Sequence, residues 1–389
     1  MPVKNRFAEL LPEIAGWRQD FHTHPELRFD LPRTAGRVAQ LLREFGCDEV
    51  VEGIGQIGVV GVIHGRNGPA GKVLGFRADM DALPIIEATG LAHASTEAGK
   101  MHACGHDGHT AILLGAARYL TETRNFDGTV VLAFQPAEEG GGGAKAMVAD
   151  GLMERWNVDE IYGLHNMPGL PAGSFAIKQG PLLAAADFFE ITVRGRGGHG
   201  AMPHLSVDTT LAAAAIVQAV QSVVSRNVPA LSPAVVSICG FMTDTMAHNV
   251  IPDTAKLTGT VRTFDVAIKT LIVERLRAVV ATTAAVYGAT VDFEYMDGVL
   301  PTINAPDQTE HAIAAAQSVA GAVKTDIDPS MGGEDFADML AVRPGAFILL
   351  GNGDSAGLHH PKYEFNDEAI PAGCSWFAAL AEQRLPLAG

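Results

Sequence analysis

Short apolar runs, each followed by polar residues, recur along the chain and set its predicted architecture. Four runs have strand length: Val73 to Phe76, Thr129 to Phe134, Ile161 to Leu164 and Ala346 to Leu350. Helical patterns lie between them, such as the Ala- and Leu-rich stretch Thr110 to Leu120. Continuously apolar strands that alternate with helices are typical of parallel sheets buried on both faces. We therefore predict an α/β domain built on a mainly parallel sheet, with helices on both faces.

The pattern changes between about Ala184 and Val299. Strands and helices there follow the order β-α-β-β-α-β over Phe188–Val193, Ser206–Val224, Ala234–Phe241, Ala255–Arg262, Ile268–Tyr287 and Thr290–Tyr295. This order is the ferredoxin-like α+β pattern. We therefore predict a discontinuous first domain, residues 1–183 and 300–389, interrupted by an inserted ferredoxin-like domain, residues 184–299.

The N-terminal region carries two amphipathic helical patterns, Asn5 to Phe21 and Arg33 to Phe45. His22 and His24 lie between them, before Pro25, and their spacing would allow a metal ion. We interpret them as residues of a hydrogen-bonded turn, because no acidic residue is paired with them nearby in the sequence.

Polar residues gather where the predicted strands end. Ligands of open parallel sheets bind beyond the carboxyl ends of the strands, so we expect these residues on one rim. They are Asp79, Asp81, Glu138, Glu139, His165 and His359. The adjacent Glu138 and Glu139 point in different directions, so one can hold a metal while the other handles protons. Two solvated surface acids are the alternative, but Pro136 ends a buried strand just before them, which favours a site.

The stretch Met101 to His109 places three imidazoles, a thiol and a carboxylate in nine residues, at the start of a helical pattern. Cys104 and His106 flank one glycine, and thiolate and imidazole together suit a borderline-soft divalent ion. The alternative is that the histidines form local hydrogen bonds and Cys104 is a small buried apolar residue. The acidic and histidine residues on the predicted rim favour the metal site.

Composition excludes several classes of protein. Apolar residues make up 47% of the chain and charged residues 19%, as in a well-folded globular protein. The net charge of −16, with no basic stripe, argues against a nucleic-acid partner. Four scattered cysteines do not form a disulfide framework, and neither an apolar signal core nor a membrane-spanning run is present. We expect a cytoplasmic protein that binds neither nucleic acid nor membrane.

Three further motifs have simpler interpretations. Gly53 to Gly58 matches the dinucleotide fingerprint, but a strand pattern follows it instead of a helix, so we predict a hairpin turn. Gly353 to Gly357 matches the nucleophile elbow of serine hydrolases, but the helix that this motif requires is missing. The acidic pair Glu334 and Asp335 opens a predicted helix, where capping explains it.

Seven motifs, in this order along the chain, resemble the metal-dependent aminoacylase and carboxypeptidase superfamily. The resemblance is to the branch of hippurate hydrolase, bacterial N-acyl-amino-acid amidohydrolases and plant indole-acetyl-amino-acid hydrolases, and it runs nearly end to end. The motifs are Arg77 to Pro84, Met101 to His109, Gln135 to Gly140, Gly163 to Asn166, Gly197 to Ala201, Asn249 to Pro252 and Leu358 to Pro361.

The resemblance implies roles for individual residues. A pair of divalent metal ions would be bound by Cys104, His106, Glu139, His165 and His359. Glu138 would be the general base, and Asp81, with Asp79 beside it, would orient a ligand. His359 aligns better than His360 with the last ligand of the family. The inserted domain would act as a lid and mediate a dimer, or a dimer of dimers, that presents His199 to the partner's active site.

The implied activity is hydrolysis of the amide bond of N-acyl amino acids to a carboxylic acid and a free amino acid. His199 would stabilise the oxyanion, and Asn249 and Arg262 are candidates to hold the carboxylate of the substrate. The mixed ligands admit Mn²⁺, Zn²⁺, Co²⁺ or Ni²⁺. A dipeptidase or carboxypeptidase with the same chemistry is the alternative, and a non-catalytic metal-binding protein is a remote one, which Glu138 disfavours. The acyl specificity stays open.

Overall fold

The computed structural model describes residues 5–387 and divides into two compact units. Unit 1 comprises Met1–Leu182, Thr302–Pro329 and Asp335–Gly389, and unit 2 comprises Leu183–Pro301 and Ser330–Glu334. The four N-terminal residues and the last two, which the predicted first domain includes, lie outside the described residues. The short return of the chain to unit 2 at Ser330–Glu334 was not predicted from the sequence.

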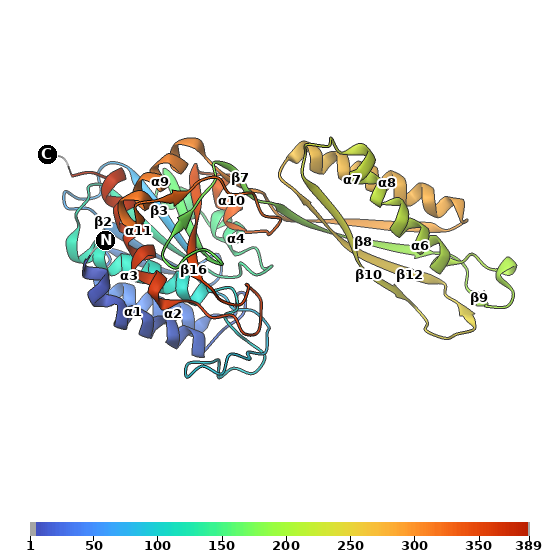
Figure 1. The fold of residues 1–389 in the computed structure, drawn as a ribbon, viewed down its shortest axis with the longest axis horizontal. Coiled ribbons are helices and arrows are strands. Elements are labelled where there is room, and N and C mark those ends of the chain that lie inside the picture. The colour runs from blue at the N-terminus through green and yellow to red at the C-terminus, as the bar shows by residue number, and fades with distance from the viewer. Residues whose placement is uncertain (1–4, 388–389) are drawn as a thin grey trace. The chain divides into compact units, whose positions relative to one another are not determined.

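Unit 1 is built on one eight-stranded sheet with the order β1-β2-β4-β3-β5-β16-β6-β15. The four central strands, β4, β3, β5 and β16, run parallel, and β1 and β2 pair antiparallel at one edge (Figure 1). The prediction of a mainly parallel α/β sheet is therefore confirmed. The strands are β1 (Glu49–Ile54), β2 (Gly58–His64), β3 (Val73–Asp79), β4 (Thr129–Gln135), β5 (Glu160–Pro168), β6 (Phe175–Ala176), β15 (Val323–Lys324) and β16 (Gly345–Gly353).

Helices cover both faces of this sheet because the central strands are apolar on both sides. One core joins alternate strand residues, such as Leu74 and Phe76 of β3, with the long helices. These helices are α1 (Asn5–Thr23), α2 (Pro32–Phe45), α3 (His106–Thr123), α9 (Pro306–Ala320) and α11 (Ile370–Arg384). The short helices α4 (Gly143–Ala149) and α10 (Phe336–Leu340) contact β4 and β5, and α5 (Leu152–Arg155) follows α4. All seven residues of β3 are consequently buried.

The segment Gly53 to Gly58 forms a hairpin, as the sequence predicted. Strands β1 and β2 pair antiparallel across it. Gly55 has a φ of +61°, and a Cβ there would lie 2.7 Å from the backbone nitrogen of Met147. The glycines are therefore explained by a tight turn and a close packing contact, as the hairpin prediction expected, and not by a nucleotide-binding loop.

Unit 2 has the predicted β-α-β-β-α-β order, with an antiparallel sheet of order β10-β12-β8-β13. Buried residues such as Ile191, Ile216 and Leu276 pack the helices on one face of the sheet. The main elements are β8 (Ala185–Arg194), α6 (Thr209–Ala219), α7 (Gln221–Asn227), β10 (Ala234–Thr243), β12 (Thr254–Thr263), α8 (Val266–Val286) and β13 (Thr290–Val299). Two short strands, β9 (Gly198–His199) and β11 (Val250–Ile251), pair with each other.

The predicted helix Ser206–Val224 is wrong in its bounds. The structure has two helices, which meet at Val220, and the first begins at Thr209. Asp208 sets this start, because its side chain accepts a hydrogen bond from the backbone N–H of Leu211. No Gly or Pro marks the break at Val220, so the residue pattern could not show it.

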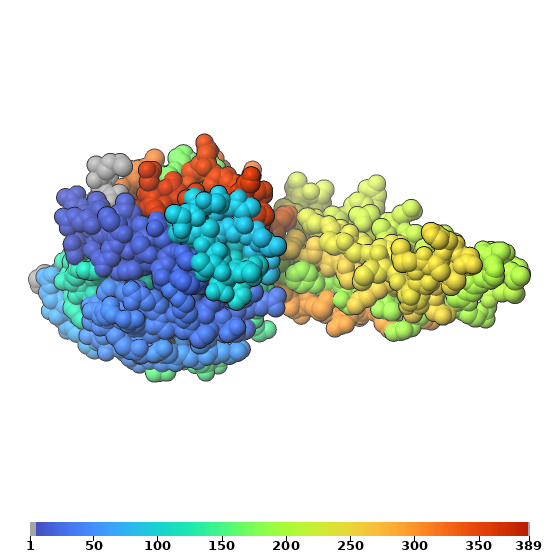
Figure 2. Space-filling model, turned by 90° about the horizontal axis from the view of Figure 1, so that it is seen from below, coloured from blue at the N-terminus to red at the C-terminus, as the bar shows by residue number. Residues whose placement is uncertain are grey.

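The turn predicted for His22 is wrong, because α1 continues through His22 to Thr23. His24 does lie in a bend after this helix, with Nδ1 2.9 Å from the backbone oxygen of Asp20. The ring of His22 is fully buried, with Nδ1 2.9 Å from Asp107 Oδ2 and Nε2 3.4 Å from Glu87 Oε1. Glu87 belongs to the irregular segment 84–100, which covers part of one face of unit 1 beside α1 (Figure 2, cyan beside dark blue). Both acidic partners are distant in sequence, which is why proximity along the chain did not reveal them.

We expect this buried histidine to make stability depend on pH. Burial opposes its charged form, but Asp107 and Glu87 outweigh burial and raise the pKa of His22 from 6.5 to about 9. A raised folded-state pKa stabilises the fold below the unfolded value, and the contribution is lost as the pH rises from about 6.5 through about 9. A tenfold difference in proton affinity between the folded and unfolded states corresponds to about 1.4 kcal/mol, so the free energy of unfolding should fall by a few kcal/mol.

Urea titrations across that pH range measure this effect. The variant His22→Phe keeps an aromatic ring but cannot carry the charge, so its stability should fall less steeply over the same range. Equal slopes for the two proteins would refute the assignment to His22.

None of the helices within residues 5–387 is both long enough and apolar enough to cross a membrane.

Candidate metal centre

Side chains from four separate segments of unit 1 converge at the carboxyl-end edge of its central strands. The predicted end of a strand before His165 is wrong, because β5 continues through His165 to Pro168. Among the described residues, five sets of possible ligands have their atoms within 4.8 Å of one another, and three of these sets consist only of predicted metal ligands and the predicted base. These three sets are Cys104, His106 and His165; Cys104, Glu139 and His359; and His106, Glu138 and Glu139. The structure thus brings together all five predicted metal ligands and the predicted base.

His106 and His165 each present Nε2 to the centre. His106 Nδ1 donates a hydrogen bond to the backbone oxygen of Asp81 at 2.8 Å, and His165 Nδ1 to that of Asn166 at 2.7 Å. These bonds fix the tautomer that leaves Nε2 free for a metal, as is usual for ligating histidines. Burial and the neighbouring His109 hold the pKa of His165 well below its ordinary value, so its ring is neutral, as a ligand must be.

His106 starts α3, four residues earlier than the predicted start at Thr110. Its ring is fully buried, and Nε2 has no hydrogen-bond partner. Burial disfavours the imidazolium, but Asp79 and Cys104 outweigh burial and raise the pKa of His106 well above its ordinary value. Such negative surroundings also favour a bound cation, which would displace the proton from the same nitrogen.

Glu139 and Cys104 complete the donor set with oxygen and sulfur. Glu139 Oε1 is buried and without a hydrogen-bond partner, although His359 Nε2 lies 3.4 Å away. Cys104 Sγ lies 3.4 Å from His165 Nε2. Burial raises the pKa of the Cys104 thiol to about 12, so the thiolate forms only beside a cation. Buried polar atoms are normally partnered, so the free atoms of His106 and Glu139 fit a divalent ion.

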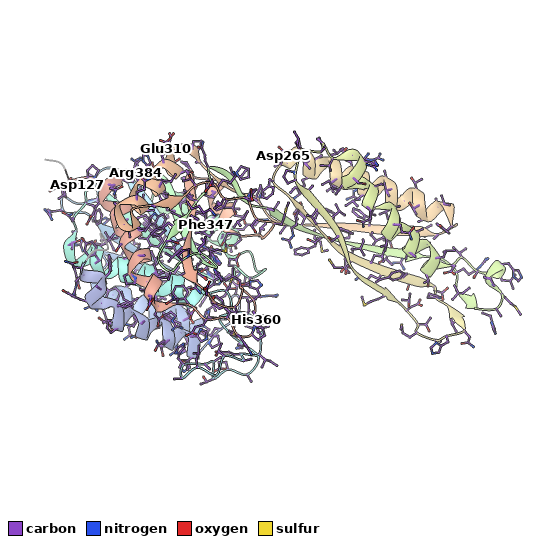
Figure 3. All side chains as sticks on the ribbon, viewed as in Figure 1. Asp127, Asp265, Glu310, Phe347, His360 and Arg384 are labelled. Atoms are coloured by element: carbon purple, nitrogen blue, oxygen red, sulfur yellow. The ribbon has the colours of Figure 1, made fainter. Side chains whose placement is uncertain are left out.

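His359, and not His360, reaches this centre. His359 has a φ of +63° and donates its backbone N–H to the oxygen of Ala103 at 2.7 Å, which places its ring beside Glu139. His360, labelled in Figure 3, lies at the periphery of unit 1, and its Nδ1 accepts the backbone N–H of Lys362. Among the described residues, His360 belongs to none of the possible ligand sets.

Asp81 holds the segment that carries the two glutamates. Its Oδ1 accepts the backbone N–H of Glu138 at 2.9 Å, and its Oδ2 accepts that of Glu139 at 3.1 Å. The carboxylate is buried and also lies 3.7 Å from His106 Nδ1. Asp81 therefore positions the backbone of two site residues at once, in addition to the ligand orientation that the family resemblance implies.

His109 and Asn166 are structural parts of the site that their sequence context did not reveal. His109 Nδ1 is 2.7 Å from Asp79 Oδ1, and Nε2 accepts the backbone N–H of Asn166 at 2.9 Å. Both ring nitrogens of His109 are thus used, which excludes it as a ligand in this arrangement. The Asn166 side chain donates to the backbone oxygen of Cys104 at 2.6 Å and accepts from the hydroxyl of Tyr363 at 2.7 Å. The only signal in the sequence was their position inside two motifs.

Gly105, between Cys104 and His106, packs closely against this hydrogen-bond network. Its φ is +87°, and a Cβ there would lie 2.3 Å from Asn166 Nδ2 and 2.5 Å from the hydroxyl oxygen of Tyr363. We expect Gly105→Ala to lower the free energy of unfolding by roughly 1–3 kcal/mol and to reduce the metal content, because backbone strain and displacement of Asn166 add up. Thermal unfolding and elemental analysis measure both. Gly90→Ala is the control, because Gly90 has a φ of +73° but no atom within 4 Å of its Cβ position; equal losses in both would refute the packing argument.

The three remaining predicted site residues lie in unit 2. His199 is the last residue of β9 and pairs with Val250, the residue after Asn249. His199, Asn249 and Val250 are exposed. Arg262 lies in β12, with its guanidinium carbon 5.9 Å from the centre of the Phe188 ring. Within residues 5–387 Arg262 makes no hydrogen bond or ion pair, so it is available to an anion.

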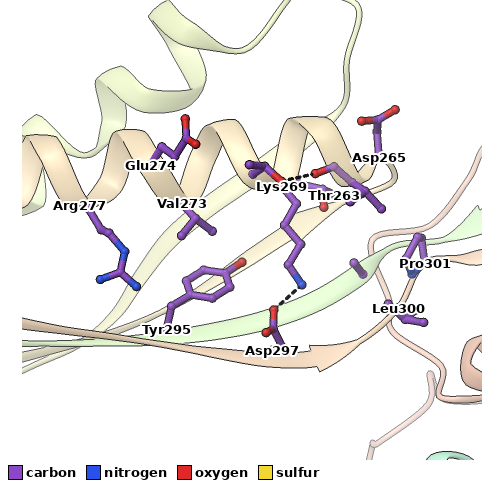
Figure 4. Close-up of a pocket in the computed structure, with 13 residues that line it drawn as sticks. Thr263, Asp265, Lys269, Val273, Glu274, Arg277, Tyr295, Asp297, Leu300 and Pro301 are labelled. Atoms are coloured by element: carbon purple, nitrogen blue, oxygen red, sulfur yellow. Dashed lines mark hydrogen bonds and ion pairs between the residues drawn. The ribbon is translucent and has the colours of Figure 1, made fainter.

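Unit 2 also contains a surface hollow of about 400 Å³ between α8 and β13 (Figure 4). Its central charges pair with one another, since Lys269 Nζ lies 2.7 Å from Asp297 Oδ1 and 2.9 Å from Asp187 Oδ2. It contains none of the predicted site residues and none of the possible ligand sets found among the described residues. This hollow therefore offers no candidate for the metal site.

Comparisons with known proteins show what the chain is similar to. The model of peptidase family M20/M25/M40 matches residues 75–383. The chain is 40% identical over 369 residues to N-acetylcysteine deacetylase of Bacillus subtilis (95% of this chain, 96% of the relative). It is 40% identical over 381 residues to hippurate hydrolase of Campylobacter jejuni (96% and 98%). Among solved structures, a dinuclear metal binding peptidase of the M20 family from Bacillus subtilis superposes with a TM-score of 0.83 at 36% identity (97% and 99%).

Proposed function

The chain belongs to peptidase family M20/M25/M40, and on this premise we propose that it is a metal-dependent amidohydrolase of N-acyl amino acids. The reaction splits the amide bond to give a carboxylic acid and a free amino acid. The observation that carries the proposal is the convergence of Cys104, His106, Glu139, His165 and His359 beside Glu138. The related deacetylase and hippurate hydrolase support the choice of an N-acyl substrate.

The five ligand residues would hold two divalent ions. Mn²⁺ and Zn²⁺ are the first candidates, and Co²⁺ and Ni²⁺ also suit a set of one thiolate, three imidazoles and one carboxylate. When bound, the ions would lower the pKa of water and polarise the amide carbonyl.

Glu138 would be the general base. Its carboxylate lies within 4.8 Å of possible ligand atoms of His106 and Glu139, and the bond from its backbone N–H to Asp81 fixes its position. From there Glu138 takes a proton from the attacking water and delivers it to the nitrogen of the leaving amino acid. General acid and base catalysis of this kind contributes about 10²- to 10⁴-fold to rate.

Unit 2 would supply the groups that bind the substrate and the oxyanion. The guanidinium of Arg262, which makes no hydrogen bond or ion pair within residues 5–387, can hold a carboxylate through two hydrogen bonds. Asn249 would assist it, and His199 would donate a hydrogen bond to the oxyanion. For His199 we propose action in the active site of a partner subunit.

The edges of the unit 2 sheet support a dimer through β10. This strand carries no charged residue, and its Phe241 and Met242 are exposed. The opposite edge, β13, carries Asp292, Glu294 and Asp297, whose like charges oppose pairing with a second copy. The apolar edge is therefore the better surface for self-association into a dimer or a dimer of dimers.

Mixed subunits test the role of His199. We expect Glu138→Gln and His199→Ala to be nearly inactive when assayed separately. A mixture should regain activity, because a mixed dimer contains one site with both intact residues. Steady-state hydrolysis before and after unfolding and refolding the mixture together measures this. A mixture with no more activity than its components would refute action between subunits.

The activity itself is tested by assaying the protein with each metal on benzoyl-glycine, acetyl-amino acids and dipeptides side by side. We expect the N-acyl amino acids to be the best substrates. A preference for dipeptides would favour a dipeptidase or carboxypeptidase with the same chemistry. No hydrolysis of any of these compounds with metal supplied would point to a non-catalytic metal-binding protein.

For the cellular location we propose the cytoplasm. All four cysteines are free thiols, and reducing compartments preserve thiols.

A further inference from the structure

Asp335 does not play the capping role that its position suggested. It occupies the N-cap position of α10, yet its side chain makes no capping hydrogen bond. Its carboxylate is fully buried and accepts hydrogen bonds from Gln135 Nε2 at 2.7 Å and from the backbone N–H of Ala144 at 3.0 Å. Arg77 Nη2 donates to the same carboxylate at 3.2 Å. The Asp335 carboxylate therefore binds polar groups in the interior of unit 1 and does not cap the end of α10.

Arg77 connects Asp335 to the metal centre. It lies in β3 and is fully buried, with Nη1 2.8 Å from Asp79 Oδ2 and Nε 2.8 Å from Gln135 Oε1. Its guanidinium carbon lies 5.6 Å from the centre of the Phe336 ring. Removing one member of a buried ion pair leaves an uncompensated charge, so Asp335 and Asp79 together determine where Arg77 lies.

Asp79 connects Arg77, through hydrogen bonds, to two segments that carry predicted metal ligands. Its Oδ1 binds His109 Nδ1, and His109 Nε2 accepts the backbone N–H of Asn166, the residue after His165. The side-chain amide of Asn166 then donates a hydrogen bond to the backbone oxygen of Cys104. One continuous chain of hydrogen bonds therefore runs from Asp335 to the backbone beside two ligands of the centre.

We propose that Asp335 is a positioning residue of the metal centre, acting through Arg77 and Asp79 on the segments that carry Cys104 and His165. The inference rests on the proposed function, because it assumes that this centre binds metal. It assigns Asp335 no contact with substrate or metal. Partners behind the ligands typically change metal affinity by about 10- to 100-fold when they are removed, and for so indirect a partner we expect about tenfold.

The test compares Asp335→Asn with Asp338→Asn, using Co²⁺ alone as the probe. Asp338 lies one turn further along α10 and, among the described residues, its side chain makes no hydrogen bond, so its variant makes the same change of charge outside the network. Titration gives the dissociation constant of Co²⁺, and the thiolate-to-cobalt absorption band reports the geometry at Cys104. Circular dichroism and thermal unfolding without metal establish that each variant is folded.

Asp335→Asn should bind Co²⁺ about tenfold more weakly than the wild-type protein and show an altered thiolate band, whereas Asp338→Asn should match the wild-type protein. If Asp335→Asn does not fold, Gln135→Met provides the second test. It keeps the length of the side chain but removes its bonds to Arg77 and Asp335, so it should weaken Co²⁺ binding in the same direction.

The outcomes separate this inference from the proposed function. A wild-type protein that binds none of Mn²⁺, Zn²⁺, Co²⁺ and Ni²⁺ would overturn the proposed function itself. A wild-type protein that binds Co²⁺, with a folded Asp335→Asn or Gln135→Met of unchanged affinity and spectrum, would overturn the positioning role and leave the proposed function standing. A loss of stability with unchanged metal binding would likewise show that Asp335 serves only the fold.

Discussion

Replacing Glu138 by Gln should lower kcat about 10³-fold and leave both metal ions bound, because it removes the proton acceptor but keeps the size of the side chain. The backbone bond from Glu138 to Asp81 is unaffected by this change, so the loop should keep its conformation. KM should change little, since the carboxylate acts on the attacking water and not on substrate binding. Steady-state kinetics and elemental analysis of the purified variant measure the two effects.

The neighbouring residue offers a matched control. Glu139→Gln makes the same chemical change one residue away, on the side chain whose Oε1 faces His359 Nε2 in the centre. We expect this variant to lose metal as well as activity. If Glu138→Gln loses metal like its neighbour, or keeps its turnover, the assignment of the base is wrong.

Replacing Cys104 by Ala should lower the metal content of the purified protein and abolish most of its activity. The thiol belongs to two of the possible ligand sets, so its loss weakens both positions. Because burial raises the pKa of the thiol to about 12, binding metal there must release a proton, and affinity should fall as the pH is lowered. Metal titrations at several pH values, with elemental analysis, measure both effects.

Cys374→Ala is the control for this experiment. Cys374 is also fully buried with a raised pKa, but it lies in α11, where its thiol donates to the backbone oxygen of Ile112. The variant should keep its metal. An unchanged metal content in Cys104→Ala, or an equal loss in Cys374→Ala, would remove Cys104 from the ligand set.

Local patterns predicted the parts of the fold that depend on neighbouring residues. Apolar runs of strand length predicted the central sheet, and the end of β4 predicted the edge where Glu138 and Glu139 lie, whereas His165 lies within β5 and not after its end. The start of α3 was placed too late, because Gly105 precedes it without a side-chain cap that a pattern could detect. The family resemblance, which the comparisons confirm, supplied the proposed roles that spacing alone left open.

Long-range contacts could not be predicted from one sequence. Asp335 and Arg77 are 258 positions apart, so Asp335, together with Glu334, was interpreted from its local context as a helix cap. His22 was interpreted as a turn residue because its partner Asp107 is 85 positions away. Buried polar groups find partners wherever the fold brings them, and their positions in the sequence carry no mark of it.

Diffraction from crystals of the protein grown with Mn²⁺ or Zn²⁺, recorded at the absorption edge of the metal, is the most direct test of the metal centre. We expect two anomalous peaks in each chain, at about 2.0–2.3 Å from the donor atoms of Cys104, His106, Glu139, His165 and His359, with Glu138 beside them and bound to neither. The absence of peaks among these five residues, or a peak bonded to Glu138 in place of Glu139, would contradict the account.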